Sequence, residues 1–438
     1  MRPDMTVISS QLLSESYIRV QHASGLWVYV MQKPTVSMSA TLCVMAGGCD
    51  TRFYLPGQRR MTTVPDGTAH FLEHKIFASE DGGDVMPLFT AIGATCDAYT
   101  TPDITCYLCN TLDHKEEALG ILLDFVTHPY FTKENVASEH DIIAQELAMY
   151  EDAPSQIGYY NLMRAMYKTH PAKKNVGGTR RSIQRITPDV LYTFHRAFYV
   201  PENMILCVAG DITVDEVLSV CDEHLPKENN QPTARRADIR EARDIVRNEV
   251  KAYSDVPMPL LYLGYKSKMP SEDPIVRMTE ETALDLANDI LFGPSSHFYS
   301  ENYKKGLIGS RFGVDVTYTQ TTSHTVIDAE TPDPDALIAA YIATLENEKT
   351  SPSITEEVFI RAKRVMYASA AYAFDSNDDM VNECISYAAD GTEFFTAADI
   401  AERMTLSEMY EILYAYYDTM QFAKSLVLPK SYRHRKEK

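Results

Sequence analysis

The sequence has no long apolar run and few cysteines. No stretch approaches the roughly 18 apolar residues that a membrane span requires. The opening residues lack the basic start and apolar core of a secretory signal. The 8 cysteines among 438 residues show no framework spacing, which is typical of reduced, buried thiols. We therefore expect a cytoplasmic protein without a membrane partner.

Basic residues are scarce relative to acidic ones. Lys and Arg number 41 against 61 Asp and Glu, so the net charge at pH 7 is −20. A nucleic-acid surface needs clustered cations that displace counterions from phosphates, so we expect no nucleic-acid partner. The charge favours solubility first and the attraction of basic peptides second. The length and the 45% hydrophobic content indicate a folded protein of more than one domain.

Two similar series of secondary-structure patterns follow one another along the chain. The first series predicts strands at 26–30, 37–45, 95–108 and 203–209, and helices from about 70, at 115–126 and at 133–150. After a polar stretch, the second series predicts strands at 260–265, 310–319, 323–329 and 423–428, with a helix at 273–292 and several later helices. We predict a catalytic half at 1–225, a linker at 226–243 and a homologous non-catalytic half at 244–438.

An alignment of the two halves indicates one site per chain. HFLEHKIF at 70–77 can be placed on DLANDILF at 285–292, so that the Phe ending each segment coincides. In this register the chemically active residues of the first segment lie opposite Asp285, Asn288 and Asp289. The second copy therefore lacks the histidines of the first.

The segment HFLEH has the spacing of a metal-binding helix. His70 and His74 are four residues apart, so on a helix they lie one turn apart on one face and can bind one ion through their imidazoles. Glu73 flanks them, and a carboxylate there can reach a metal-bound water without being a ligand. Zinc lowers the pKa of that water to about 7, and Glu73 can accept its proton.

A catalytic zinc ion needs a third protein ligand and an open position. Glu139 and Glu146 lie seven residues apart on the predicted helix 133–150, so they project from one face. Glu146, beside Ala144 and Leu147, has the more apolar surroundings and is the predicted ligand. Glu139 is predicted to support the site through a hydrogen bond. Without the upstream motif, each glutamate would be interpreted as a solvated surface charge.

These residues closely resemble the pitrilysin family of inverted-motif zinc peptidases, in particular its bacterial processing-protease-like branch. The resemblance covers nearly the whole chain and is carried by AGGCDTRF, GTAHFLEHKIF, GATCDAYT, the glutamate pair, HPAKKNVGGT and NMILCVAGD. It implies one zinc ion per chain on His70, His74 and Glu146, with Glu73 as general base and Glu139 in support. It also implies an α+β fold of two homologous sandwich halves, each with helices on one face of a mainly antiparallel sheet.

The resemblance further implies a zinc-dependent endopeptidase that hydrolyses peptides or unfolded polypeptide segments. Family members usually enclose a chamber with four such units, which implies a homodimer or a heterodimer with a related chain. Substrate would add as a strand along the sheet edge at 93–100. The residues expected to contact it are Gly93, Ala94, Asp97, Ala98 and Tyr99.

Two departures from the family pattern leave an alternative open. The family commonly has Asn where this chain has Asp97, and its second half often supplies an Arg and a Tyr that bind the substrate carbonyl. The matching positions here are Asn302 and Gly309. Loss of a donor aimed at the developing oxyanion costs roughly 10²–10³ in rate. The alternative is a non-catalytic or weakly active structural or regulatory subunit of a paired complex. Manganese or cobalt could also occupy a His₂Glu site.

The C-x-x-C sequence formed by Cys106 and Cys109 is not expected to bind a metal or to act in redox chemistry. The two residues lie three apart on a predicted strand, so their side chains point to opposite faces. The glycine pair Gly177-Gly178 is not followed by phosphate-loop residues and is interpreted as a turn.

Overall fold

The chain folds into two compact units, neither of which is continuous in sequence. The computed structural model describes residues 5–80, 82–228, 231–418 and 421–435. The first unit comprises Met1–Ala148, Asn175–Asp238 and Ala371–Phe395. The second comprises Met149–Lys174, Ile239–Ala370 and Thr396–Lys438. The predicted boundaries at 225 and 243 describe a repeat along the sequence and stay a prediction, whereas the compact units draw segments from both sides of them.

The first unit is built on a seven-stranded sheet with the order β1-β2-β3-β9-β4-β8-β7. Its strands are β1 (Thr6–Ser10), β2 (Glu15–Gln21), β3 (Trp27–Gln32), β4 (Met38–Val44), β7 (Thr95–Thr100), β8 (Thr105–Thr111) and β9 (Met204–Gly210). Only the β3–β9 pair in this sheet is parallel among the described residues. Every residue of the central strands β4 and β9 is buried, which explains their almost continuously apolar sequences.

The prediction of one strand at 95–108 was wrong. The segment is a hairpin in which β7 and β8 are joined by residues 101–104, and the N–H of Thr101 donates to the carbonyl of Ile104 at 2.8 Å. Pro102 cannot donate to a strand ladder, and Pro102-Asp103 favours a turn. The β-rich composition on both sides concealed this break.

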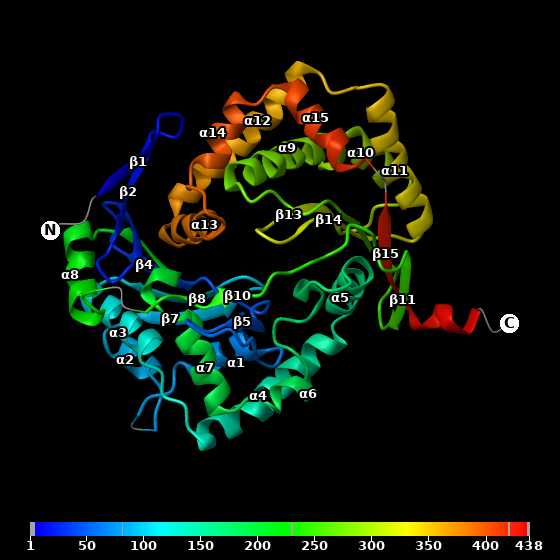
Figure 1. Cartoon of the computed structure of the whole chain (residues 1–438). Coiled ribbons are helices and arrows are strands. Elements are labelled where there is room, and N and C mark those ends of the chain that lie inside the picture. Colours follow the sequence, from blue (N-terminus) through cyan, green and yellow to red (C-terminus); the bar gives the residue numbers. More distant parts are fainter. Residues whose placement is uncertain (1–4, 81, 229–230, 419–420, 436–438) are drawn as a thin grey trace. The chain divides into compact units, whose positions relative to one another are not determined.

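Helices cover both faces of the first sheet. They are α1 (Thr68–Lys75), α2 (Met86–Ala91), α3 (Lys115–Thr127), α4 (Lys133–Asp152), α6 (Arg180–Ile183), α7 (Pro188–Phe198), α8 (Val214–His224) and α13 (Asn377–Asp390). In Figure 1, α1, α3 and α7 lie on one side of the sheet and α13, in orange, on the other. One apolar core fills the space under α3 and α7, and a second core, which includes Met31, Val381 and Phe395, lies under α13.

The second unit repeats the strand order of the first. Its sheet has the order β11-β15-β12-β14-β13 and consists of β11 (Glu249–Ser254), β12 (Leu260–Lys266), β13 (Phe312–Tyr318), β14 (Ser323–Glu330) and β15 (Phe422–Pro429). As in β3-β9-β4-β8-β7, the first pair is parallel and the others are antiparallel. The predicted α+β fold with mainly antiparallel sheets is confirmed.

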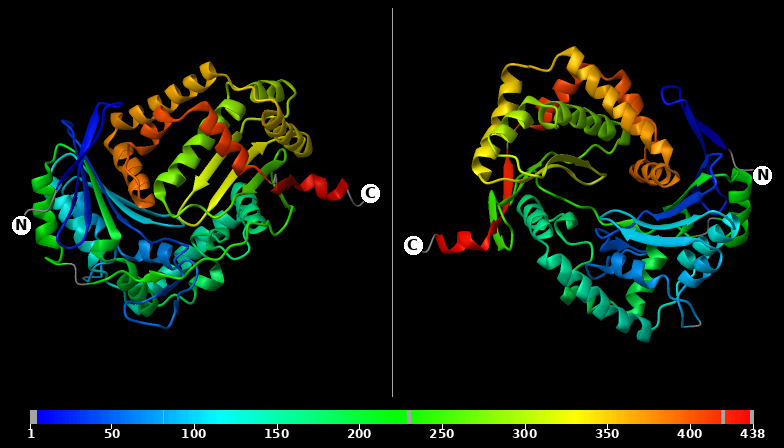
Figure 2. Two further views of the ribbon diagram at one scale, coloured as in Figure 1. Left: turned by 45° about the horizontal axis from the view of Figure 1, so that its top comes forward. Right: turned by 180° about the vertical axis from the view of Figure 1, so that it is seen from behind.

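The helices of the second unit also cover both faces of their sheet. They are α5 (Pro154–Met166), α9 (Pro274–Phe292), α10 (His297–Lys304), α11 (Pro334–Thr350), α12 (Glu356–Tyr372), α14 (Thr396–Arg403) and α15 (Leu406–Tyr416). Figure 2 shows α9 lying along the β13–β14 arrows. On β12, Tyr262 and Gly264 meet α5, whereas Tyr265 packs against Tyr416 of α15. Because neighbouring strand residues point to opposite faces, α5 covers the face turned away from α15.

The two units exchange one helix each. In the chain, α5 follows the β7–β8 hairpin and precedes β9, and α13 holds the matching place between β14 and β15. Yet α5 packs on β12 and β15 of the second unit, and α13 packs on β4 and β9 of the first. Each sheet is therefore completed by a helix from the other half of the sequence.

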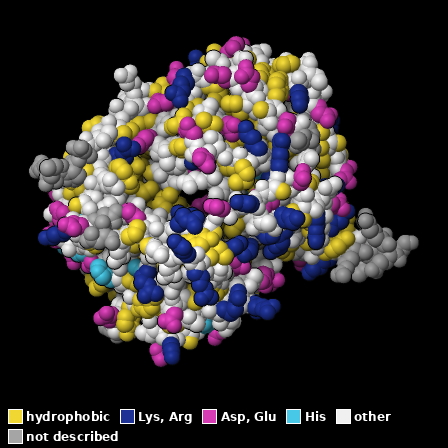
Figure 3. Space-filling view, viewed as in Figure 1, with side chains coloured by type: hydrophobic (Ala, Val, Ile, Leu, Met, Phe, Trp, Pro, Cys, Tyr) yellow, Lys and Arg dark blue, Asp and Glu magenta, His cyan; other side chains and the backbone are white. Residues whose placement is uncertain are grey.

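The net charge of −20 is not spread over the chain as a uniform acidic surface. Lysine and arginine side chains stand among the acidic ones on the face shown in Figure 3.

Within the described residues, no helix combines the length and the apolar character that crossing a membrane would take.

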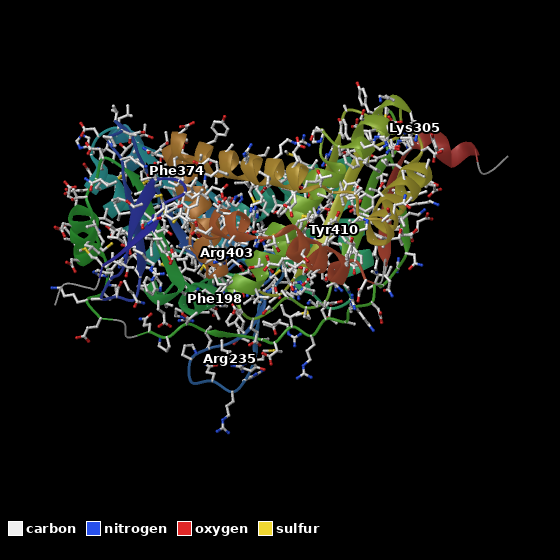
Figure 4. All side chains as sticks on the ribbon, turned by 90° about the horizontal axis from the view of Figure 1, so that it is seen from above. Phe198, Arg235, Lys305, Phe374, Arg403 and Tyr410 are labelled. Carbon is white, nitrogen blue, oxygen red and sulfur yellow. The ribbon has the colours of Figure 1, made fainter. Side chains whose placement is uncertain are left out.

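Part of the predicted linker is ordered. A three-stranded sheet of the first unit contains β5 (Arg52–Tyr54), β6 (Thr62–Thr63) and β10 (Arg235–Arg236). The guanidinium of Arg235, labelled in Figure 4, stands 4.3 Å above the ring of Tyr54. Arg236 Nε donates to Asp50 Oδ1 at 2.7 Å. Residues 229–230 of the predicted linker lie outside the described residues.

Candidate metal centre

Helix α1 begins where two backbone segments touch. Gly67 precedes the helix with φ 92° and ψ 0°, and a Cβ on it would lie 2.4 Å from the carbonyl oxygen of Gly177. A Cβ on Gly178 would lie 2.4 Å from the carbonyl oxygen of Asp66. The left-handed backbone and the lack of space admit only glycine at 67 and 178. The glycine pair thus makes the expected turn and also packs against the start of the helix that carries both histidines.

The predicted ligands converge in the first unit. His70 Nε2 lies 3.5 Å from Glu146 Oε1, and His74 Nε2 lies 3.4 Å from Glu146 Oε2. One ligand atom from each of the three residues lies within 4.8 Å of the other two. The two imidazoles come from consecutive turns of α1, and the carboxylate comes from α4. Side-chain exposures of 14% for His70 and 25% for each of the others leave the group accessible from one side.

The separations fit a small divalent cation better than they fit direct hydrogen bonds. Protein hydrogen bonds between nitrogen and oxygen are usually about 2.7–3.2 Å long. Tetrahedral coordination with bonds of about 2.1 Å instead separates neighbouring ligand atoms by roughly 3.4 Å. The donor set of two imidazoles and one carboxylate suits zinc and leaves a fourth position open. His70, His74 and Glu146 could therefore hold one metal ion.

Glu139 orients His74 from the opposite side of the ring. Glu139 Oε1 lies 3.2 Å from His74 Nδ1, which turns His74 Nε2 toward Glu146. Lys75 Nζ donates to Glu139 Oε2 at 3.0 Å, and both of these side chains are mostly buried. Such hydrogen bonds fix the tautomer and direction of a ligating imidazole.

Burial and local charge act in opposite directions on this pair. Burial lowers the pKa of His74, but the hydrogen bond to Glu139 and the charges of Glu73 and Glu146 outweigh it, so the pKa is raised. Burial raises the pKa of Glu139, but His74 and Lys75 outweigh it, so that pKa is lowered. Glu139 therefore stays ionised and able to accept a hydrogen bond from His74 Nδ1.

Glu73 is held by the edge strand of the sheet. Thr100 Oγ1 on β7 donates to Glu73 Oε2 at 2.5 Å, and only 9% of the surface of Glu73 is exposed. The hydrogen bond leaves the second carboxylate oxygen of Glu73 available for other contacts. Glu73 directly precedes His74 on α1, and its charge helps to raise the pKa of His74, so its carboxylate lies near the candidate metal position.

The comparisons with known proteins identify the family. Residues 57–180 match the model for insulinase (peptidase family M16), and residues 185–366 match the model for the peptidase M16 inactive domain. The chain is 32% identical over 427 residues to YmfH of Bacillus subtilis (strain 168), named an uncharacterized zinc protease, and the alignment covers 97% of this chain and 99% of YmfH. This chain belongs to peptidase family M16.

Solved M16 structures share the fold. A putative M16-like peptidase from Alicyclobacillus acidocaldarius matches with a TM-score of 0.88 and 30% identity, over 98% of this chain and 99% of that one. Pitrilysin matches with a TM-score of 0.78 and 16% identity, over 98% of this chain but 47% of pitrilysin. The predicted family is confirmed, and the match to pitrilysin supports the fold.

The edge of the M16 sheet lies where the sequence predicted it. β7 is the terminal strand of its sheet. Cys96 and Ala98 are half-buried against the core, while Asp97 and Tyr99 are exposed and point to the other face. Just before the strand, Gly93 is exposed and Ala94 is buried. The roles of these residues in substrate binding stay a prediction.

Asn302 and Gly309, the positions matched to the family's Arg and Tyr, carry no side chain suited to a substrate. Asn302 is 4% exposed, and its Nδ2 donates to the carbonyl of Phe298 within α10 at 2.8 Å. A Cβ on Gly309 would lie 2.9 Å from the carbonyl oxygen of Glu330. Both positions therefore serve the packing of the second unit.

Sequence reasoning missed several residues of the centre and judged one pair correctly. Thr100 and Lys75 stand next to predicted site residues, but their contacts join segments distant in sequence. Gly67, directly before the helix, is a local signal of its start. As expected, Cys106 and Cys109 face opposite sides of β8 and join different cores.

Proposed function

We propose that this chain is a zinc-dependent endopeptidase that hydrolyses peptides or unfolded polypeptide segments. The observation that carries the proposal is the convergence of His70, His74 and Glu146, with the Glu73 carboxylate close enough to act on His74. The family and the names of relatives support a protease, and the ligand types support zinc. One zinc ion per chain follows, because the described residues contain one such group.

Each side chain of the centre has a part in the proposed reaction. His70, His74 and Glu146 would hold the zinc ion, which would supply Lewis acidity and lower the pKa of water to about 7. The Glu73 carboxylate accepts a proton from the attacking water and passes it to the departing amine nitrogen. Thr100 holds Glu73 in place, and Glu139 keeps His74 Nε2 directed at the metal position.

We place the substrate along β7, the open edge of the first sheet. An extended peptide would add there as a further strand and use its backbone donors and acceptors, so recognition would depend little on sequence. Gly93 and Ala94 would lie at the start of this edge, and Asp97, Ala98 and Tyr99 along it.

A second chain would complete the enzyme. This chain matches 47% of pitrilysin, which is consistent with pairing as a dimer. Since neither Asn302 nor Gly309 can donate to a substrate carbonyl, a related chain that carries such donors is the favoured partner, and a homodimer is the other possibility. The cytoplasmic location stays a prediction from the sequence.

The same two positions favour the second candidate function, a weakly active structural or regulatory subunit. The deciding experiment compares the wild type with Glu73→Gln in zinc content and in cleavage of a broad peptide mixture read by mass spectrometry. We expect both proteins to bind about one zinc per chain and only the wild type to cleave. If the wild type binds zinc but cleaves nothing, alone or with a related chain, the subunit function is correct.

A further inference from the structure

Asp97 is an exposed carboxylate in the middle of the open edge strand. It lies on β7, whose one neighbour in the sheet is β8. Its side chain is on the same face as those of Thr95 and Tyr99, and all three residues are exposed. In the part of the chain that the structure describes, no Lys, Arg or His forms an ion pair with Asp97. The carboxylate is thus accessible and, among the described residues, has no cationic partner.

Asp97 is bonded to the backbone of its own strand. The N–H of Ala98 donates to Asp97 Oδ1 at 2.8 Å. Edge strands carry backbone donors that no neighbouring strand satisfies, and here the adjacent carboxylate accepts from one of them. An extended chain that adds to this edge competes with the carboxylate for the N–H. The displaced carboxylate then needs another donor, because a desolvated charge without a hydrogen bond is costly.

We propose that Asp97 selects peptides with a lysine or arginine at the one position that lies opposite it along β7. The proposal rests on the function proposed above, since it assumes that substrate adds to this edge. A cationic side chain supplies charge-assisted donors to the displaced carboxylate, a neutral one leaves it poorly paired, and an acidic one is repelled. An asparagine at 97 would accept the same backbone N–H without preferring a cation.

A single-position preference differs from general attraction by the net charge. Long-range attraction to a chain of charge −20 favours cations at every position of a peptide. Moreover, the face in Figure 3 carries both signs of charge. Asp97 instead acts on the residue directly across from it, because the peptide residues on either side point to the other face. The pattern along the peptide therefore tells the two causes apart.

Asp84 offers a matched control. It is an exposed aspartate of the same unit, and its Oδ1 accepts from the N–H of Met86 at 2.7 Å before α2. An asparagine can keep that hydrogen bond, as it can at position 97. Asp84→Asn and Asp97→Asn therefore remove the same charge, the first just before α2 and the second on β7.

The test is a charge scan of a neutral 14-residue peptide in which each position in turn becomes Lys, Arg or Glu. Peptide binding is measured with the zinc-loaded full chain carrying Glu73→Gln. The kcat/KM for cleavage is measured with the full chain in which Glu73 is intact. We expect Lys and Arg to improve binding about 3- to 10-fold at one position, and salt to reduce this preference. Adding Asp97→Asn should abolish the preference, Asp84→Asn should keep it, and Asp97→Lys should transfer it to Glu.

The outcomes separate this proposal from the proposed function. Cleavage without a single-position preference, or a preference that survives Asp97→Asn, overturns the role of Asp97 and leaves the peptidase standing. If no peptide is cleaved but binding shows a single-position preference that depends on Asp97, the role of Asp97 is retained and the peptidase function is contradicted. Absence of any peptide binding overturns the proposal for Asp97. Thermal unfolding of each variant confirms that it is folded.

Discussion

Each unit carries an equivalent hairpin at the edge of its own sheet, yet the helices that precede the two hairpins differ. β7–β8 and β13–β14 are each joined by four residues, at 101–104 and 319–322. The longer helix before the first hairpin, α1, has 8 residues and no side-chain cap and is followed by α2, whereas α9 has 19 residues, is capped by Asp273 and is followed by α10. The shared sheet therefore does not depend on the metal centre. The proposed chemistry depends on a short helix whose start is fixed by contact with another loop.

A buried Glu–Lys pair in each unit makes the same point. In the first, Glu139 and Lys75 are 3.0 Å apart, and the other oxygen of Glu139 faces His74. In the second, Glu241 and Lys266 are 3.1 Å apart, and Glu241 accepts backbone N–H groups of residues 168–170. The same type of ion pair orients a candidate metal ligand in one unit and holds a chain segment in place in the other.

Removal of the carboxylate ligand should produce the largest difference between the two units. Glu146→Gln takes away the charged oxygen that faces both imidazoles, so we expect metal affinity to fall at least about 100-fold and cleavage to be lost. Asp285→Asn, at the position predicted to match His70, should leave metal content near one per chain. Elemental analysis after dialysis measures both. An equal loss of metal in the two variants would contradict the assignment of the centre to the first unit.

The second-largest effect is expected from a substitution that crowds the start of α1. In Gly67→Ala, the alanine must keep the left-handed backbone conformation, and its Cβ would lie 2.4 Å from the carbonyl oxygen of Gly177. We therefore expect the unfolding free energy to fall by about 3 kcal/mol and metal binding to weaken. Gly57 has φ +70° and nothing within 4 Å of its Cβ position, so Gly57→Ala should cost about 1 kcal/mol. Urea denaturation compares the two. Similar losses would show that the contact with Gly177 contributes nothing.

The pH dependence of stability should show how much Glu241, the carboxylate paired with Lys266, stabilises the second unit. Burial raises the pKa of Glu241, but hydrogen bonds from residues 168–170 outweigh it and lower the pKa to about 2. The folded state binds its proton less readily than the unfolded state, so the stabilisation is present above pH about 4.5 and is lost as pH falls toward 2. Glu241→Gln should cost roughly 2–3 kcal/mol at pH 7 and progressively less below pH 4.5.

Denaturation curves at several pH values test this expectation. The control is Glu249→Gln, which removes a 37% exposed partner of Lys424 and should cost less than about 1 kcal/mol at any pH. A constant difference between Glu241→Gln and the wild type down to pH 2 would speak against the lowered pKa.

The smallest effect is expected from the lysine that supports Glu139. Lys75→Met keeps most of the packing volume but leaves Glu139 Oε2 without its cation, so we expect metal affinity to fall about 10-fold. Lys266→Met should lower stability and leave the metal affinity of the folded protein unchanged. Competition with a fluorescent chelator measures the affinity, and Lys75→Arg should restore part of it. If Lys266→Met lowers metal affinity as much as Lys75→Met, the distinction between the two pairs is wrong.

The candidate ligands, which the structure brings together, could be found in the sequence because helical spacing is local information. His70 and His74 lie one turn apart on α1, and Glu139 and Glu146 lie two turns apart on α4. The strand break at Pro102 was missed although it is equally local, because β-branched and aromatic residues continue on both sides. Periodicity shows that a segment is a helix with an apolar face, but not which sheet that face meets.

The supporting contacts lay beyond such reasoning for a physical reason. Thr100 meets Glu73 across 27 residues, and Lys75 meets Glu139 across 64. The exchange of α5 and α13 depends on packing between the two halves of the sequence. None of these contacts leaves a periodic trace in a single sequence.

The exchanged helix α13 also constrains the order in which the protein can mature on the ribosome. The first sheet is complete in sequence at Gly210, but the apolar face that includes Tyr17, Met31 and Cys43 is covered by residues 377–390. More than a third of translation therefore separates the last strand of that sheet from the helix that shields it. During this interval the nascent chain displays an uncovered apolar surface, the kind of surface that promotes aggregation and that chaperones bind.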